Sequence, residues 1–212
     1  MSMALPRLTP EALRDAMGEM CEMALQMLRK AWEGFRQASL PTLDEVGVLG
    51  RDLHVREKRL TEHVAIQIRE YPWSLGTAQH LAFLPAALER VGDSVETLAR
   101  CAYALLREGI PYSERGSADV MELFRQTEEL LERIVTAIRT GDRGHLSHVR
   151  KAGERFQAYS DEVLLSHQDR LLRGICVARA SSLFFAMLDG FREIERYTRR
   201  MSRDLEKAAT AG

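Results

Sequence analysis

The 212-residue sequence has little of what marks several common protein classes. Its three cysteines, Cys21, Cys101 and Cys176, lie far apart without a CxxC spacing, which argues against a disulfide scaffold or a structural zinc site. There is no run of about 18 apolar residues, so we expect no membrane span. Residues 1–6 are too short and too weakly basic for a signal peptide. We therefore expect a cytoplasmic protein with buried, structural thiols.

An excess of charge of either sign is also missing. The 30 basic and 31 acidic residues leave a formal charge of -1, whereas a dedicated nucleic-acid binder usually carries a basic excess. P-loop, dinucleotide-binding and GxSxG motifs are absent, so we predict neither a nucleic-acid partner nor an enzyme. The six histidines lack HxH and HExxH spacings and are interpreted as surface residues.

Long helical periodicity is what the sequence does contain. Apolar residues recur at spacings of three and four, as on one face of an α-helix, and no useful alternating strand pattern occurs. The capping box at residues 42–45 predicts the start of the second helix, and Pro85 should kink the third or soften its first turns. The six apolar stripes run from Leu13 to Phe35, Val46 to Val64, Leu81 to Leu105, Val120 to Ile138, Val149 to Val163 and Val177 to about Lys207.

The stripes repeat at an offset of about 100 residues. Leu88 and Val91 map onto Leu188 and Phe191 at this offset. We therefore predict an all-α, six-helix bundle made of two three-helix repeats, packed antiparallel as one bundle. The predicted parts are a tail over 1–8, a first repeat over 9–108 and a second repeat over 112–207.

Two acidic pairs stand at equivalent places in the repeats. Glu89 and Asp93 are four residues apart, and so are Asp189 and Glu193, which places each pair on one helix face. The apolar stripe is elsewhere on the helix, so both pairs should lie on the surface. Repulsion between like charges at this spacing destabilises a helix by about 0.2–0.5 kcal/mol. A cation bound between the two carboxylates would turn this repulsion into attraction. A solvated charged face, neutralised by arginines one turn away, is the alternative.

Around the first pair, the segment 88–94, Leu-Glu-Arg-Val-Gly-Asp-Ser, resembles the signature of the PhoU proteins, which regulate phosphate uptake. Asp52-Leu53-His54-Val55 resembles the start of the family's preceding helix, and Tyr71-Pro72 falls where its first helical hairpin turns. The resemblance covers about residues 13–204 and implies a PhoU-like domain repeated twice.

The resemblance also implies metal binding, and the chain departs from the family at this point. The second pair exchanges the two acid types, and Arg59 and His63 stand where the family often has acids. Glu57 and Glu62 are nearby substitutes in the first repeat, and Asp161 and Glu162 in the second. We predict two surface sites for iron, magnesium, manganese or calcium, one in each repeat, with ligands drawn from Glu62, Glu89, Asp93, Asp161, Glu162, Asp189 and Glu193.

The function implied by the resemblance is a cytoplasmic regulator of phosphate transport and phosphate-starvation signalling. Such a protein binds a phosphate transporter, peripherally at the inner membrane, and in many bacteria a sensor histidine kinase. One alternative is an accessory protein of a sodium- or proton-coupled phosphate carrier, with no kinase partner. A remote alternative, a carboxylate metal-storage bundle, would need inward-facing carboxylates with Glu-x-x-His motifs, which the sequence lacks.

A homodimer is a further prediction. Six of the nine methionines fall in the first 27 residues, and Phe184 and Phe185 add apolar bulk that exceeds what one helix seam needs. These side chains would serve a dimer interface or a transporter contact. Packing of the methionines in the chain's own core is the alternative.

Overall fold

In the computed structural model, residues 10–70 and 82–210 are described, and every element of regular structure among them is an α-helix. The prediction of an all-α protein is therefore confirmed. None of the described helices has the length and hydropathy needed to cross a membrane. The six helices are α1 (Pro10–Gln37), α2 (Leu40–Glu70), α4 (Leu84–Arg107), α5 (Glu114–Thr140), α6 (Arg143–Leu172) and α7 (Ala178–Thr210).

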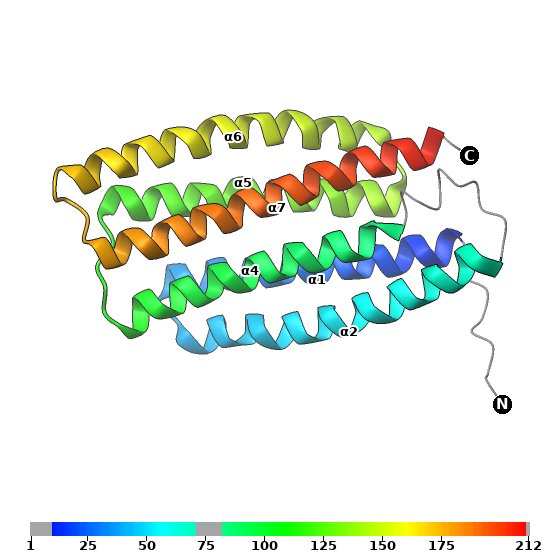
Figure 1. The fold of residues 1–212 in the computed structure, drawn as a ribbon, viewed down its shortest axis with the longest axis horizontal. Helices are drawn as coiled ribbons and strands as arrows, with labels where there is room; N and C mark the ends of the chain where they lie inside the picture. The colour runs from blue at the N-terminus through cyan, green and yellow to red at the C-terminus, as the bar shows by residue number, and fades with distance from the viewer. Residues whose placement is uncertain (1–9, 71–81, 211–212) are drawn as a thin grey trace.

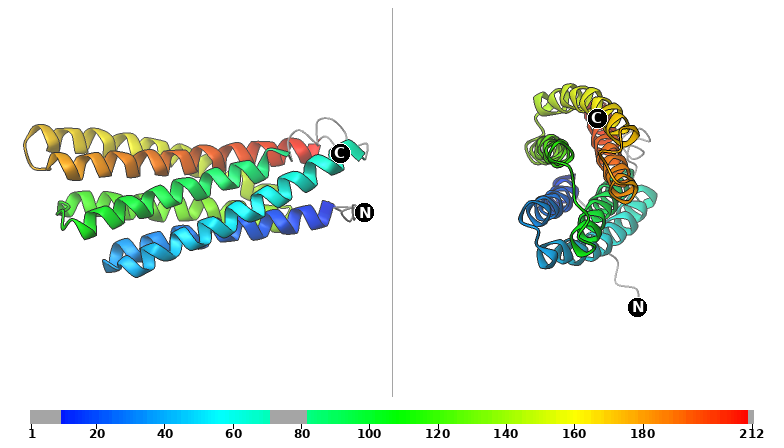
Figure 2. Two further views of the ribbon diagram at one scale, coloured as in Figure 1. Left: turned by 60° about the horizontal axis from the view of Figure 1, so that its bottom comes forward. Right: turned by 90° about the vertical axis from the view of Figure 1, so that its left-hand side faces the viewer.

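The helices run along one long axis and form two groups of three (Figures 1 and 2). Within one group α1, α2 and α4 pack against each other, and within the other α5, α6 and α7 do so. The groups meet where α1 packs on α5 and α4 packs on α7. The predicted boundary between residues 108 and 112 falls in the connection between α4 and α5. That the groups are copies of one unit stays a prediction.

The predicted apolar stripes form one continuous core. Leu88 and Val91 of α4 are fully buried, and Phe124 of α5 meets Phe191 of α7 edge to face, with 4.8 Å between ring centroids. Each such large side chain stabilises the fold by about 1.5–3 kcal/mol through burial. Aromatic contact between α5 and α7 therefore fixes the centre of the second group.

The side chains that suggested a dimer interface are largely taken up by this core. Met17, Met20 and Met27 are at most 2% exposed. These methionines therefore pack in the chain's own core, as the alternative interpretation expected. Phe184 is 1% exposed, and Phe185 is half-buried against the core. The interpretation of these phenylalanines as excess surface bulk is wrong, because their rings fill space between α6 and α7. The homodimer itself stays a prediction.

Two predicted helix features are displaced. The second helix begins at Leu40, before the predicted capping box, because the Ser39 hydroxyl accepts the Thr42 N–H at 3.3 Å and caps the helix. The regular part of α4 begins at Leu84, so Pro85 lies in its first turn, where a missing N–H costs no hydrogen bond. The expected kink at Pro85 is therefore wrong. Leu81, at which the predicted stripe of this helix begins, lies outside the described residues.

The two helical hairpins turn with different residues. Ala38, between α1 and α2, has a left-handed backbone with φ 53°. Gly141, between α5 and α6, has φ 70°, and Asp142 then caps α6 by accepting the Gly144 N–H at 2.8 Å. The segment Thr-Gly-Asp-Arg-Gly at 140–144 predicts a turn, which the structure confirms, and glycine adopts its backbone without the cost that alanine has at residue 38.

Candidate metal centre in the groove between α2 and α4

A groove of about 430 Å³ lies between α2 and α4, on the face that carries the first acidic pair. Glycines bring the two helices together along it. A Cβ on Gly92 would lie 2.4 Å from Leu53 Cδ2, and a Cβ on Gly50 would overlap the Glu96 carboxylate. The groove therefore has an apolar floor at Leu53 and acidic walls, including Glu89 and Glu96.

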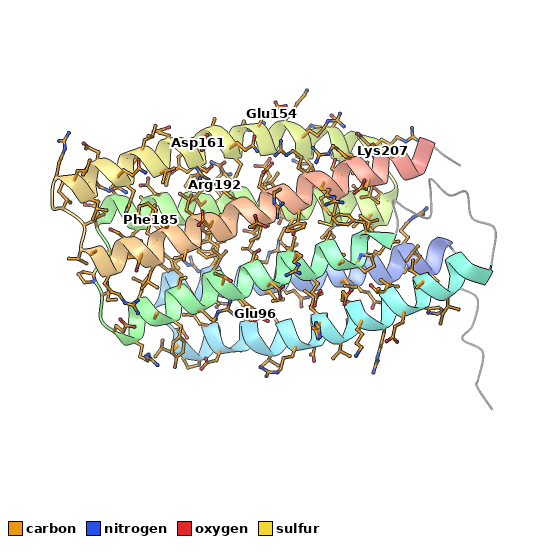
Figure 3. All side chains as sticks on the ribbon, viewed as in Figure 1. Glu96, Glu154, Asp161, Phe185, Arg192 and Lys207 are labelled. Carbon is orange, nitrogen blue, oxygen red and sulfur yellow. The ribbon has the colours of Figure 1, made fainter. Side chains whose placement is uncertain are left out.

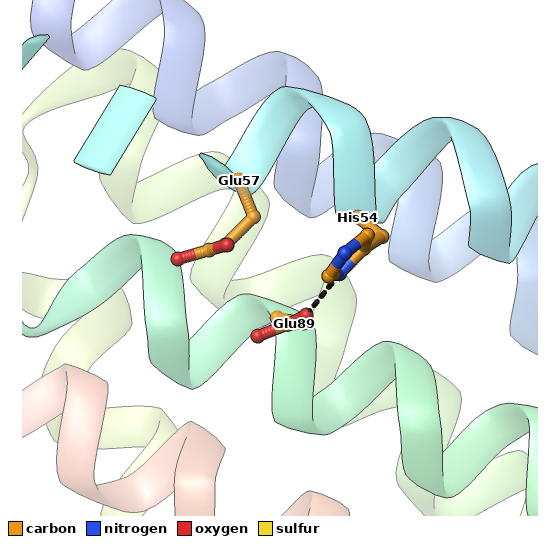
Figure 4. Close-up of side chains that lie close together, drawn as sticks. All are labelled: His54, Glu57 and Glu89. Carbon is orange, nitrogen blue, oxygen red and sulfur yellow. Dashed lines mark hydrogen bonds and ion pairs between the residues drawn. The ribbon is translucent and has the colours of Figure 1, made fainter. Parts of the chain in front are cut away.

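Three potential metal ligands converge at this groove (Figure 4). His54 and Glu57 are one turn apart on α2, and Glu89 faces them from α4. One ligand atom of each lies within 4.8 Å of the others. The Nδ1 atom of His54 contacts Oε1 of Glu89 directly. Glu89 is 24% exposed and His54 is 64% exposed, so the centre is open to water on one side.

This donor set fits a single divalent cation. One imidazole nitrogen and two carboxylates, with water completing the shell, suit manganese, iron or zinc better than the all-oxygen preferences of magnesium and calcium. Within residues 12–66 and 82–207, no other three histidine, cysteine or acidic side chains converge in this way. Sequence reasoning found Glu89 but left His54 out as a surface histidine. The overlooked signal was the His-x-x-Glu spacing on α2, opposite the acidic pair.

The other acids predicted around this centre lie apart from the triad. The Asp93 carboxylate lines the groove but is 3.4 Å from the Arg90 guanidinium, one turn away on the same helix. Glu62 is exposed on α2 and does not line the groove. Glu96, a groove residue that was not predicted as a ligand, pairs with Arg100 at 3.3 Å. The first half thus brings to the centre one predicted ligand, Glu89, and one of the two acids named as nearby substitutes, Glu57.

The second half meets its acids with arginines. Asp161 of α6 pairs with Arg192 of α7 at 2.6 Å (Figure 3), and Glu193 pairs with Arg196. Asp189 of α7 and Glu162 of α6 are both exposed to solvent. Among the described residues, the predicted ligands of the second half therefore do not converge as a group of three. The guanidinium groups supply the positive charge that a cation would otherwise bring.

A buried polar network in the second half was missed altogether. The Asp119 carboxylate of α5, 1% exposed, pairs with Arg170 of α6 at 3.1 Å and with Arg115 at 2.9 Å. His167 is 3% exposed and stacks on Phe184 with 4.0 Å between ring centroids. The interpretation of all histidines as surface residues is wrong for His167, because the apolar positions around it place it on the buried face of α6. Burial, and then the charge of Arg170, lower the pKa of His167.

Glu195 of α7 is a second buried acid, 2% exposed. Its carboxylate lies over Gly153 of α6, pairs with Arg199 at 2.9 Å and accepts from Gln157 at 3.4 Å. Burial raises the pKa of Glu195, although Arg199 opposes the rise. Nothing in the helical periodicity separates this buried acid from the exposed ones around it.

The fold and groove define an elongated all-α bundle of two three-helix groups with carboxylates on one surface groove. Solved structures of PhoU proteins share this fold. PhoU from Pseudomonas aeruginosa matches with a TM-score of 0.85 and 16% sequence identity, covering 95% of this chain and 97% of that one. The phosphate transport system regulatory protein PhoU from Streptococcus pneumoniae matches with a TM-score of 0.82 and 11% identity, covering 94% of both chains.

No protein-family model matches the sequence, and no curated protein sequence matches it. The structural likeness therefore rests on the path of the chain, over nearly its whole length. The chain has the PhoU fold, and the resemblance seen in its sequence is confirmed at that level.

Proposed function

We propose that this protein is a cytoplasmic regulator of phosphate transport and phosphate-starvation signalling that acts by binding other proteins. The observation that carries the proposal is the PhoU fold over 94–95% of the chain, shared with a phosphate transport system regulatory protein. The PhoU-like segment 88–94 supports the proposal independently of the fold, because the resemblance was found in the sequence alone. This segment lies on α4 and lines the groove.

We place the partner contact on the groove between α2 and α4. The groove combines an apolar floor with acidic walls, and Val55 adds an apolar side chain at its edge that is 47% exposed. Such a surface can bury an anchor side chain and pair with a basic rim on a partner. The partners proposed are a phosphate transporter and a sensor histidine kinase; the alternative is a phosphate carrier alone.

We also propose that a divalent cation held by His54, Glu57 and Glu89 joins α2 to α4. A cation there would offset the repulsion between Glu57 and Glu89 and fix the shape of the groove. A metal-storage role is less well supported, because these three ligands lie at the surface and not between helices in the core.

Gene deletion and complementation in the native host test the regulatory role. We expect the deletion strain to take up labelled phosphate at a rate that no longer follows external phosphate, and the wild-type gene to restore the response. Unchanged uptake in the deletion strain would refute the proposal.

A photo-crosslinking residue at Val55 tests the place of contact. Met121 of α5, which is 39% exposed, is the matched control position. Crosslinks from Val55 to a transporter subunit and to a histidine kinase support the signalling role, and crosslinks to a carrier alone support the accessory role. Equal crosslinking from Met121 would remove the groove from the proposal.

A further inference from the structure

A second cavity lies at the end of the bundle where α5 and α7 both begin, the left-hand end in Figure 1. It has a volume of about 160 Å³ and is remote in sequence from the α2–α4 groove. Its walls come from three helices and the connection between α6 and α7. Its lining includes Tyr112, Ser113 and Gly116 at the start of α5, His167 of α6, and Val177 and Ala180 at the start of α7.

The backbone N–H groups in the first turn of α7 are not capped by the side chain of the preceding residue. Val177 precedes the helix and has no side-chain oxygen, and the first turn holds no acid. The first backbone bond of the helix runs from the Ser181 N–H to the Val177 carbonyl at 3.0 Å. The N–H groups of residues 178–180 therefore lack intrahelical acceptors. At the start of α5, by contrast, Ser113 accepts the Gly116 N–H at 3.0 Å.

The buried His167 side chain adds a donor of another kind. Its Nδ1 atom lies 3.5 Å from Nη2 of Arg170, and because a guanidinium can only donate, Nδ1 is the acceptor. The proton of the neutral ring is then on Nε2, which is buried and has no hydrogen-bond partner in the described structure. Phe184 and Phe185 hold the ring from its face and its edge.

The acids near the cavity are already neutralised. The carboxylate of Asp119 pairs with Arg115 and Arg170, and Glu108 pairs with Arg179 at 2.7 Å. The donors left at the cavity are thus the buried Nε2–H of His167 and the start of α7, where Ala180 lines the cavity, and an acceptor would satisfy them.

We propose that this cavity binds a small oxyanion, held by Nε2–H of His167 and the first-turn N–H groups of α7. The volume admits a group the size of phosphate, sulfate or a short carboxylate, and the apolar side chains of Val177 and Ala180 restrict it to small ligands. The inference does not depend on the proposed role in phosphate regulation, because it uses only the donors at this end of the bundle.

Titration of the full-length protein with inorganic phosphate, sulfate and acetate, each followed by calorimetry and by NMR of ¹⁵N-labelled histidine, tests the proposal. We expect one anion to bind at a ratio of one to one and to shift the Nε2 resonance of His167. Binding of phosphate and sulfate identifies a tetrahedral oxyanion, and binding of acetate alone identifies a carboxylate. No shift at His167 with any of the three would overturn the proposal and leave water as the partner of Nε2.

Two variants remove the donors in different ways. His167→Phe keeps an aromatic ring against Phe184 without a donor, and Val177→Asp places a capping carboxylate on the α7 N–H groups. Both should weaken binding at least tenfold, and Val177→Asp should also raise the melting temperature, which shows that it is folded. Leu165→Asp, an added acid at an α6 position that is 66% exposed, should bind within twofold of the wild type. Wild-type affinity in Val177→Asp would refute the site.

Discussion

The two halves of the bundle bury different kinds of residue. In the described part of the chain, the nine buried polar or charged residues all lie between Asp119 and Ser202, on α5, α6 and α7. The buried positions of α1, α2 and α4 hold hydrophobic residues, glycine or proline. One apolar periodicity can therefore specify two groups of helices with different interiors, because periodicity indicates which face is buried and not the identity of every residue on that face.

The halves also differ in how they balance their acids. In the second half, arginines of α7 pair with Asp161, Glu193 and Glu195. In the first half, Glu57 and Glu89 face each other across the α2–α4 groove with His54 between the helices. The second half therefore supplies counter-charge to these three acids, while Glu57 and Glu89 of the first half leave a place for a cation from solution.

The largest difference should appear when a carboxylate is removed from each half. Asp119→Ala leaves Arg170 buried without its partner, and we expect it to lower the free energy of unfolding by about 3–5 kcal/mol. Asp93→Ala removes an exposed carboxylate from the first half and should change stability by less than about 0.5 kcal/mol. Urea unfolding measures both. A loss of stability in Asp119→Ala as small as that in Asp93→Ala would show that the interior of the second half does not depend on its buried ion pair.

Metal binding should separate the halves next. We expect Glu89→Gln to weaken binding of Mn²⁺ or Zn²⁺ by about tenfold or more, because it removes one of three converging ligands. Glu193→Gln is the matched change in the second half, where Arg196 already pairs with the carboxylate, and should leave affinity within about twofold. Calorimetry with each metal measures both. If the two variants bind alike, the triad is an ordinary surface ion pair.

The hairpin turns offer a smaller, reciprocal test. Ala38→Gly should raise the free energy of unfolding by up to about 1 kcal/mol, because glycine adopts the left-handed backbone without the Cβ penalty. Gly141→Ala should lower it by about 1 kcal/mol for the same reason. Thermal and urea unfolding give both values. Opposite signs would show that the two turns are not strained in the way their φ angles indicate.

The smallest effect concerns pH and the buried acid of α7. Because burial raises the pKa of Glu195 in the folded protein, its neutral form is favoured by folding, and that contribution is lost as pH rises through the raised pKa. Glu195→Gln keeps a neutral side chain at every pH. The stability of the wild type relative to this variant should therefore fall as pH increases from about 4 to 7. A difference that stays constant over this range would contradict the assigned burial effect.

Much of the fold could be predicted from the sequence. Stripes such as Leu88 and Val91 on α4 give a helix its buried face whatever its neighbours are, and the turn at 140–144 has its own local chemistry. The capping of α2 was predicted at the wrong residues because Ser39 and Thr42 both have hydroxyls that can cap, and in the fold the Ser39 hydroxyl accepts the Thr42 N–H.

The candidate site could be predicted only in part. Spacing along one helix identified Glu89, but His54 and Glu57 belong to the centre because α2 and α4 approach at Gly92, a distance between helices that no local pattern contains. The same reason hid Asp119 and His167, since their partners are Arg170 on a different helix and the ring of Phe184 on another. Contacts between helices are set by the whole bundle.

The glycine at position 190 has a mechanical consequence. Its Cβ position lies 3.4 Å from the carbonyl oxygen of Ser94 and 3.0 Å from Leu98 Cδ2, so α7 rests almost on the backbone of α4. Backbone in close contact cannot deform as side chains do. We therefore expect α4 and α7 to shift together at this contact, so that a change in the position of α4 at the groove reaches the second half through α7.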